Sequence, residues 1–220
     1  MPQRPTALLF DLDGTLVDTI ELIMRSMEFA FSEFDGPRPT RAQWLEGLGI
    51  TLRVQVAKWA RTPQEFDSLV ERYRRYQGEH QELMTAPYPG VPEALAILRA
   101  AGHPMAIVTS KYFAMANRVL EHVGFTPFFD LVIGGDSIER PKPNPDPVLL
   151  ALGTLGVRPA EALLIGDSPH DIRAGNAAGV PTAAALWGPF SRGQLEPARP
   201  THWLMDIREL VPLAREKTDN

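Results

Sequence analysis

Apolar positions change their spacing along the chain, and this change divides the chain into two parts. From residue 17 to residue 84 they recur at intervals of three and four, the period of a helix with one buried face, and no stretch there has convincing strand character. Elsewhere, short apolar runs of strand length alternate with helical patterns, several of which end at a glycine. The pattern predicts alternating strands and helices, with an all-helical insert close to the start.

Strands that alternate with helices favour a parallel sheet with helices on both faces, the doubly wound, Rossmann-like α/β class. Residues 1–16 and 87–220 are expected to form this core domain, and residues 17–86 an inserted helical cap domain. The expected strands cover residues 5–12, 103–109, 131–133, 162–165 and 180–185, with a sixth candidate at 203–205. The expected helices cover residues 17–34, 41–48, 51–60 and 63–84 in the insert, and 91–101, 112–122, 145–155 and 169–178 after it.

Composition excludes several classes of protein. The chain has 220 residues, 44% of them hydrophobic, which suffices for a sizeable core. Its net charge of −5 argues against nucleic acid or an anionic membrane as the main partner. It has no cysteine, so thiol nucleophiles and zinc–thiolate sites are excluded. With no signal-peptide pattern in residues 1–6 and no apolar run long enough to span a membrane, a cytoplasmic protein is expected.

Two carboxylates close the first expected strand, in the sequence Asp11-Leu12-Asp13-Gly14. Alternate side chains of a strand share a face, so Asp11 and Asp13 should project in roughly the same direction. Two carboxylates at such a short distance repel each other unless one is protonated or a cation lies between them. Mg²⁺ is a suitable cation, because it prefers oxygen ligands. The alternative is an ordinary turn, in which Asp and Gly serve the backbone alone.

Polar residues also follow the other expected strands. Thr109 and Ser110 follow the second, Lys142 lies among prolines after the third, and Asp167 and Asp171 follow the fourth. In a parallel sheet these strand ends meet at one rim, where ligands of such folds bind. The set of acids, hydroxyl and lysine fits phosphoryl transfer, with a carboxylate nucleophile, cations that neutralise the phosphoryl oxygens, and a second carboxylate that moves a proton.

Helix capping is the competing explanation for several of these residues. Thr109 and Ser110 could cap the helix expected from residue 112, and Asn144 could cap a helix opened by Pro145. The stretch Ser168-Pro169-His170-Asp171 matches a capping box, and His170 is expected to be a surface residue at that helix start. Capping leaves Lys142 and Asp167 unexplained.

Four segments resemble the motifs of the haloacid dehalogenase superfamily, in the order that family has them: DLDGTLVD (11–18), VTSK (108–111), PKPNPDP (141–147) and GDSPHD (166–171). The resemblance covers residues 7 to about 210 and points to the branch of small phosphatases with a helical cap inserted after the first strand. It implies a Mg²⁺ cofactor and a small phosphorylated substrate. It also implies that Asp11 is the nucleophile and Asp13 the general acid/base. The phosphoryl group would be bound by Thr109, Ser110 and Lys142. The metal would be held by Asp11, the Asp13 carbonyl and Asp167, with Asp171 in support.

Within this family the substrate stays open. Phosphoglycolate phosphatase and a cap-bearing inorganic pyrophosphatase are the two nearest types, and residues 22–24, 73–76 and 79–83 are similar to the cap of the latter. A sugar-phosphate mutase is a further alternative, although Thr15 resembles the phosphatases rather than the mutases. A non-enzymatic phosphate-binding protein is disfavoured because every motif residue is present.

The cap is expected to act as a lid. The loop Gly47-Leu48-Gly49 and the following Arg53 are its expected substrate-facing parts, although Arg53 could equally be a solvated helix residue. Asp18 should begin the hinge to the cap. Whether the protein is a monomer or a homodimer is left open.

Overall fold

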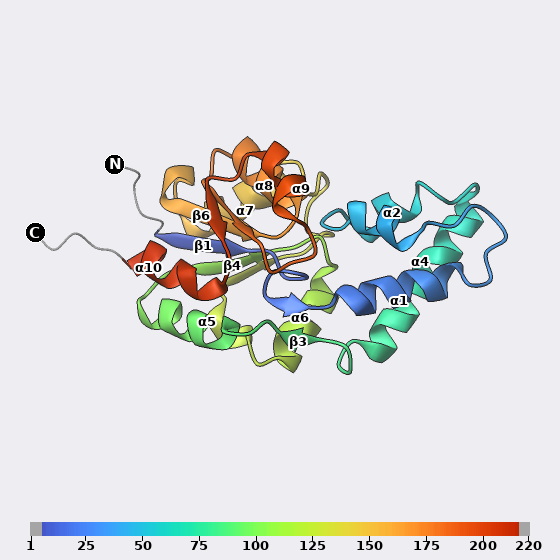
Figure 1. Cartoon of the computed structure of the whole chain (residues 1–220), viewed down its shortest axis with the longest axis horizontal. Helices are drawn as coiled ribbons and strands as arrows, with labels where there is room; N and C mark the ends of the chain where they lie inside the picture. Colours follow the sequence, from blue (N-terminus) through green and yellow to red (C-terminus); the bar gives the residue numbers. More distant parts are fainter. Residues whose placement is uncertain (1–5, 216–220) are drawn as a thin grey trace, which may run out of the picture.

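The computed structural model describes residues 6–215, and a six-stranded parallel sheet forms its centre (Figure 1). The strand order is β5-β4-β1-β6-β7-β8, so the first strand lies in the middle, with β4 and β6 as neighbours. The predicted fold class is confirmed. The strands are β1 (Ala7–Phe10), β4 (Met105–Val108), β5 (Leu131–Ile133), β6 (Ala162–Gly166), β7 (Thr182–Ala185) and β8 (His202–Leu204).

Helices cover both faces of the sheet because its central strands are apolar on both sides. Leu8 and Phe10 belong to a core cluster with residues of α5, α6 and α10, whereas Ala7 and Leu9 belong to one with residues of α7 and α8. Figure 1 shows these two groups of helices on opposite sides of β1. The helices are α5 (Val91–Ala100), α6 (Phe113–His122), α7 (Asp146–Leu155), α8 (Pro169–Ala177), α9 (Arg192–Leu195) and α10 (Leu210–Arg215), with 3-10 turns η1 (Thr126–Phe128), η2 (Pro159–Glu161), η3 (Glu196–Ala198) and η4 (Ile207–Glu209).

The insert is helical and stands beside the carboxyl ends of the strands (Figure 1). Thr40 and Thr62 cap two of its helices through their side chains, by accepting hydrogen bonds from the amides of Gln43 and Glu65. No helix within residues 6–215 is both long and apolar enough to cross a bilayer. The cap helices are α1 (Ile20–Phe31), α2 (Arg41–Glu46), α3 (Leu52–Val56) and α4 (Pro63–His80).

A two-stranded antiparallel ribbon joins cap and core. Strand β2 (Val17–Asp18) pairs with β3 (Ala86–Pro87). The expectation of a helix from residue 17, with no strand before residue 84, was therefore wrong at its first two residues. Two residues are too few for a periodic pattern, and their partner lies on the far side of the insert. Asp18 lies in this ribbon, where a hinge was expected.

The last part of the core differs most from expectation. Helices α9 and α10 were not predicted, because four- and six-residue helices carry little periodic signal. From the sequence we also expect a loose tail over residues 215–220, of which residues 216–220 lie outside the described part of the chain.

Candidate active site

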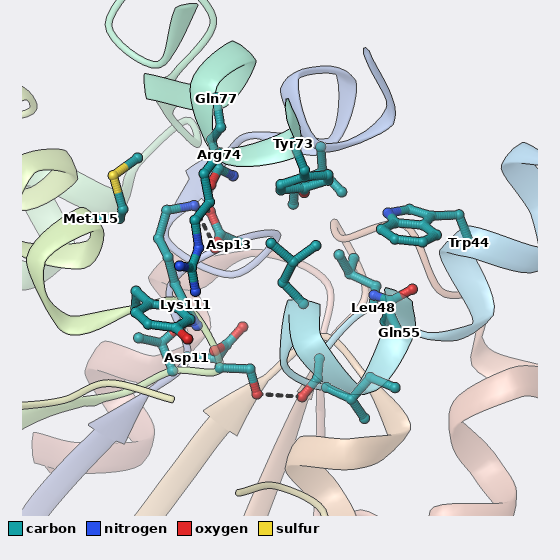
Figure 2. Close-up of a pocket in the computed structure, with 17 residues that line it drawn as sticks. Asp11, Asp13, Trp44, Leu48, Gln55, Tyr73, Arg74, Gln77, Lys111 and Met115 are labelled. Carbon is teal, nitrogen blue, oxygen red and sulfur yellow. Dashed lines mark hydrogen bonds and ion pairs between the residues drawn. The ribbon is translucent and has the colours of Figure 1, made fainter. Parts of the chain in front are cut away.

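A cleft lies between the carboxyl ends of the strands and the cap (Figure 2). Asp11 follows β1 and Thr109 follows β4, and both line it together with Asp13, Ser110 and Lys111. Its volume is about 80 Å³. The sheet topology thus brings together the polar residues that the sequence places after separate strands. From the cap, the cleft is lined by Ile23, Trp44, Leu48, Gly49, Ile50, Leu52, Gln55, Tyr73, Arg74 and Gln77.

Lys142 is the centre of a buried ion network beneath this cleft. Its Nζ donates to Asp11 Oδ1 at 2.7 Å, to Asp171 Oδ1 at 2.5 Å and to the Val108 carbonyl at 2.9 Å, and the residue is only 2% exposed. Burial by itself would lower the pKa of Lys142, but the two carboxylates more than reverse this and raise it above its usual value. The lysine therefore stays charged and holds one oxygen of Asp11 in place.

Asp171 serves two partners at once. Its Oδ2 accepts hydrogen bonds from the amide and hydroxyl of Ser168, and the Ser168 hydroxyl accepts from its amide, which confirms the predicted capping box. Its Oδ1 pairs with Lys142. Capping is therefore only half of what this side chain does.

Three buried carboxylates form a cluster with the donor chemistry of a Mg²⁺ site. Asp11, Asp167 and Asp171 each offer an oxygen, and these oxygens lie within 4.8 Å of one another. Thr15 donates to Asp167 Oδ1 at 2.7 Å, whereas Oδ2 of Asp167 is buried and has no hydrogen-bond partner among residues 6–215. A buried carboxylate oxygen without a partner is costly, and a hard cation would satisfy it. The residues present therefore fit Mg²⁺.

Burial and mutual repulsion dominate the electrostatics of this cluster. Burial raises the pKa of Asp11 to about 7, although Lys142 opposes the shift. Burial, with Asp11 and Asp171 nearby, also raises the pKa of Asp167 well above its usual value. A bound cation would favour the ionised form of each carboxylate.

Two glycines make room for Asp167. A Cβ added to Gly14, which has φ +87°, would lie 2.5 Å from Asp167 Oδ2, and one added to Gly188 would lie 2.4 Å from Asp167 Cβ. The sequence points to Gly14 only as a turn. Gly188 was missed, because it lies in the loop after β7 and nothing local marks its approach to the site.

Asp13 has partners of its own, separate from those of Asp11. Its carboxylate accepts two hydrogen bonds from Lys111 Nζ, at 2.9 and 3.0 Å, and one from the Thr19 hydroxyl at 2.6 Å. Asp11 and Asp13 both line the cleft, as expected, but each is held by a different lysine. Neither Lys111 nor Thr19 was assigned a role from sequence, although Lys111 lies within the VTSK segment.

Capping does not account for Thr109, Ser110 or Asn144. Helix α6 has Tyr112 at its N-cap without a side-chain hydrogen bond, and the Ser110 hydroxyl instead donates to the Gly49 carbonyl of the cap at 2.6 Å. Thr109 is buried, and its hydroxyl accepts from the Lys111 amide. Asn144 donates to the Pro141 carbonyl, while α7 begins one residue later than expected, after Pro145, so the predicted cap at Asn144 was wrong.

The cap contributes Leu48 and Gly49 to the cleft, as expected of the glycine loop. Arg53 is exposed, with its guanidinium 4.5 Å from the Phe66 ring centre, and it is absent from the cleft lining. Of the two roles considered for Arg53, the structure therefore agrees with that of a solvated helix residue. Arg74, from α4, lines the cleft instead and was missed, because helix periodicity alone does not say which of several cap arginines faces the core.

His170 differs from the expected surface residue. It is half-buried beneath the cap loop, where a Cβ on Gly49 would lie 3.3 Å from its Cβ, and burial lowers the pKa of its imidazole. Its place at the start of α8 suggested exposure, but the cap covers it.

The sequence model of haloacid dehalogenase-like hydrolases matches residues 8–185, which include all four motifs. The chain belongs to this family. As a haloacid dehalogenase-like hydrolase, it is an enzyme, as the sequence predicts.

Several relatives of this haloacid dehalogenase-like hydrolase are phosphatases. It is 34% identical to pyrophosphatase PpaX of Bacillus velezensis over 215 residues, covering 98% of this chain and 99% of that protein. It is 35% identical to phosphoglycolate phosphatase of Aquifex aeolicus over 183 residues, covering 82% and 84%. The crystal structure of a predicted phosphoglycolate phosphatase from Haemophilus somnus superimposes with a TM-score of 0.87 at 26% identity, covering 96% and 98%. The prediction of a phosphatase of this family agrees with all three.

Proposed function

We propose that the protein is a Mg²⁺-dependent phosphatase that hydrolyses a small phosphorylated metabolite through an aspartyl-phosphate on Asp11. One observation carries the proposal. Asp11 is held by Lys142, and Asp167, whose Oδ2 has no partner among residues 6–215, offers an oxygen within 4.8 Å of one from Asp11, so a nucleophile, a fixed cation and a potential metal ligand lie together.

The two carboxylates of the cleft have complementary tasks in this reaction. The Asp11 carboxylate attacks phosphorus, and the bond from phosphorus to the leaving oxygen breaks while Asp13 gives that oxygen a proton. Water then attacks the phosphorus of the aspartyl-phosphate and passes a proton to Asp13, while the bond from phosphorus to the Asp11 oxygen breaks and its electron pair returns to the Asp11 carboxylate. Inorganic phosphate leaves, and both aspartates return to their starting state. The separate lysine partners of the two aspartates suit this division of roles.

The phosphoryl group needs positive charge and hydrogen-bond donors around it. Lys142 supplies a charge that is buried and cannot move away, and the hydroxyls of Thr109 and Ser110 lie at the adjoining strand end. Asp11, Asp167 and the Asp13 carbonyl would hold Mg²⁺, with Asp171 close enough to support or join them. When bound, the ion neutralises charge on the phosphoryl oxygens.

A phosphoglycolate-like substrate is the first candidate, and inorganic pyrophosphate is the second. The first rests on the relative from Aquifex aeolicus and the second on the PpaX relatives, which match at similar identity. A sugar-phosphate mutase would need the aspartyl-phosphate to survive until a second sugar hydroxyl accepts the phosphoryl group. A non-enzymatic role would require the buried ion network to be retained without catalysis.

Hydrolysis of p-nitrophenyl phosphate tests the reaction. Asp11→Asn should abolish it while the circular dichroism spectrum and melting temperature stay close to those of the unaltered protein. Asp67→Asn removes an exposed carboxylate of the cap and is the matched control, which should keep full activity. Activity that survives in Asp11→Asn, or in excess chelator, would contradict the proposal. Ranking phosphate esters and pyrophosphate by kcat/KM with Mg²⁺ would then identify the substrate.

A further inference from the structure

Arg74 is a cap residue whose charged group enters the cleft from above. It comes from α4, and its guanidinium carbon lies 3.8 Å from the centre of the Tyr112 ring, which belongs to the core. Figure 2 shows the side chain descending from the cap toward Lys111 and Asp13. The stacking therefore places a cap cation beside the residues that hold the proposed general acid.

One nitrogen of this guanidinium has no partner in the part of the chain that the structure describes. Nη2 of Arg74 is buried and makes no hydrogen bond within residues 6–215. A guanidinium keeps its charge at any physiological pH, and a buried donor left unpaired is costly. An anion is the natural partner for such a group, and none of the carboxylates in the described chain forms an ion pair with Arg74.

Two other arginines of the cap, Arg61 and Arg72, do have partners. Arg72 donates to the carbonyls of Phe29 and Ala30 and pairs with Glu33. Arg61 pairs with two acids, Glu65 and Asp35. Arg53 and Arg75 are exposed, so water can satisfy their guanidinium groups. A buried guanidinium nitrogen without a partner among residues 6–215 therefore distinguishes Arg74 from these cap arginines.

The rest of the cleft suggests that an anion bound by Arg74 would belong to the leaving group of the substrate. Asp13, the proposed proton donor to the leaving oxygen, is held by Lys111, and Tyr112 directly follows Lys111 in the chain. A group bonded to the leaving oxygen would therefore extend from Asp13 toward Arg74. The amide side chains of Gln55 and Gln77 also line the cleft, and its volume of about 80 Å³ leaves room only for a short group.

We infer that Arg74 determines specificity by binding a second anionic group on the leaving group of the substrate. The inference rests on the proposed function and goes beyond it. A carboxylate and a phosphate each present two neighbouring oxygens, which a guanidinium can bind through two parallel hydrogen bonds. A phosphate ester with a short, negatively charged tail satisfies Nη2, whereas an ester with an uncharged tail leaves it buried and unpaired.

A pair of substrates with the same length but different charge tests this inference. Phosphoglycolate carries a carboxylate where 2-hydroxyethyl phosphate carries a neutral hydroxyl, and pyrophosphate carries a phosphate. In Arg74→Gln, the ratio of kcat/KM for phosphoglycolate or pyrophosphate to that for 2-hydroxyethyl phosphate should fall roughly 10- to 100-fold, the size expected for hydrogen bonds to a charged group. Arg74→Lys, which keeps the charge but loses the fork, should recover part of the ratio.

Arg75→Gln is the matched control, because Arg75 is the next residue of the same helix, is exposed, and stacks on Phe29 away from the cleft lining. It should leave the ratio unchanged. A fall confined to phosphoglycolate identifies the tail as a carboxylate, and a fall confined to pyrophosphate identifies it as a phosphate. Equal losses on all three substrates, or no loss, would overturn the inference.

The proposed function and this inference can fail separately. If the unaltered protein hydrolyses no phosphate compound, the proposed function fails, and the inference is then tested by binding. Calorimetry should show that phosphoglycolate or pyrophosphate binds more tightly than 2-hydroxyethyl phosphate, and that Arg74→Gln removes the difference. Equal affinities for all three compounds would overturn the inference whatever the activity.

Discussion

Lys111 Nζ donates hydrogen bonds to both carboxylate oxygens of Asp13, at 2.9 and 3.0 Å. The two side chains are 4% and 13% exposed, so little water competes for this pair. The Thr19 hydroxyl, from just before the first cap helix, adds a third hydrogen bond. The orientation of Asp13 thus depends on the second strand of the core and on the start of the cap together.

Removing the Lys111 charge should therefore harm proton transfer in particular. In Lys111→Met we expect kcat for an alkyl phosphate to fall about 100-fold, because a misplaced catalytic group costs about that much. The loss for p-nitrophenyl phosphate should be much smaller, since its leaving group needs little protonation. Lys58→Met alters an exposed lysine of the cap and should change neither rate. Equal losses on both substrates would show that Lys111 is only structural.

Gly188 should matter for metal affinity although it offers no ligand side chain. In Gly188→Ala the new methyl group would lie 2.4 Å from Asp167 Cβ and 2.9 Å from the Gly14 carbonyl, so Asp167 must shift. The Mg²⁺ dissociation constant, measured by calorimetry, should rise roughly 10-fold or more. Gly193→Ala is the control, because a Cβ there meets no atom of residues 6–215 within 4 Å. An unchanged Mg²⁺ affinity in Gly188→Ala would show that the loop containing residue 188 moves and that Asp167 keeps its position.

Lys142 should be needed for stability as well as for activity. Lys142→Met leaves the buried carboxylates of Asp11 and Asp171 without their cation, which should lower the free energy of unfolding by about 3–5 kcal/mol. Adding Asp171→Asn removes one of those charges, so the double variant should be less destabilised than the two single losses added together. Urea unfolding in chelator measures each value. Strict additivity would mean that the pair is not coupled.

The raised pKa values of Asp11 and Asp167 predict how pH affects the metal-free protein. Both carboxyls have a higher pKa in the folded state than the usual 3.8, so the folded state retains protons that the unfolded state has released. Their contribution to stability is complete below about pH 4 and is lost as pH rises to about 7 and beyond. Mg²⁺ binds the ionised form, so it should raise the melting temperature more at pH 8 than at pH 5.5.

Asp167→Asn isolates this effect from the other titrating groups. The variant should lose most of the Mg²⁺-induced rise in melting temperature at pH 8. In the unaltered protein, Mg²⁺ at 100 times its dissociation constant should raise the free energy of unfolding by about 2.7 kcal/mol. Asp67→Asn, an exposed acid of the cap, should keep the full rise. A rise of the same size at both pH values, or in both variants, would contradict the assignment of the cluster to the metal.

Much of the core was predictable because its signals are local. A run such as Ala7 to Phe10 is apolar on both faces and is long enough only for a strand, and the alternation with helices then requires a parallel sheet. The caps at Thr40, Thr62 and Ser168 were predictable for the same reason, since each hydrogen bond closes within three residues. The parallel sheet also implied that Asp11, Thr109 and Asp167 meet at one rim.

Contacts between distant residues were settled only by the tertiary structure. The sequence singled out Lys142 as unexplained, but its pairing with Asp11 and Asp171 depends on how two loops and the first turn of α8 pack together. The β2–β3 ribbon needs partners from both ends of the insert. Gly188 approaches Asp167 from a loop with no local mark.

The cap arginines show the same division between sequence and structure. The sequence determines by itself that the cap is helical and carries cations, because periodicity and charge are local properties. It does not determine that Arg74 faces the cleft while Arg53 faces solvent. That choice depends on the rotation of each helix about its axis, which is set by the apolar side chains packed between α1, α3, α4 and the core.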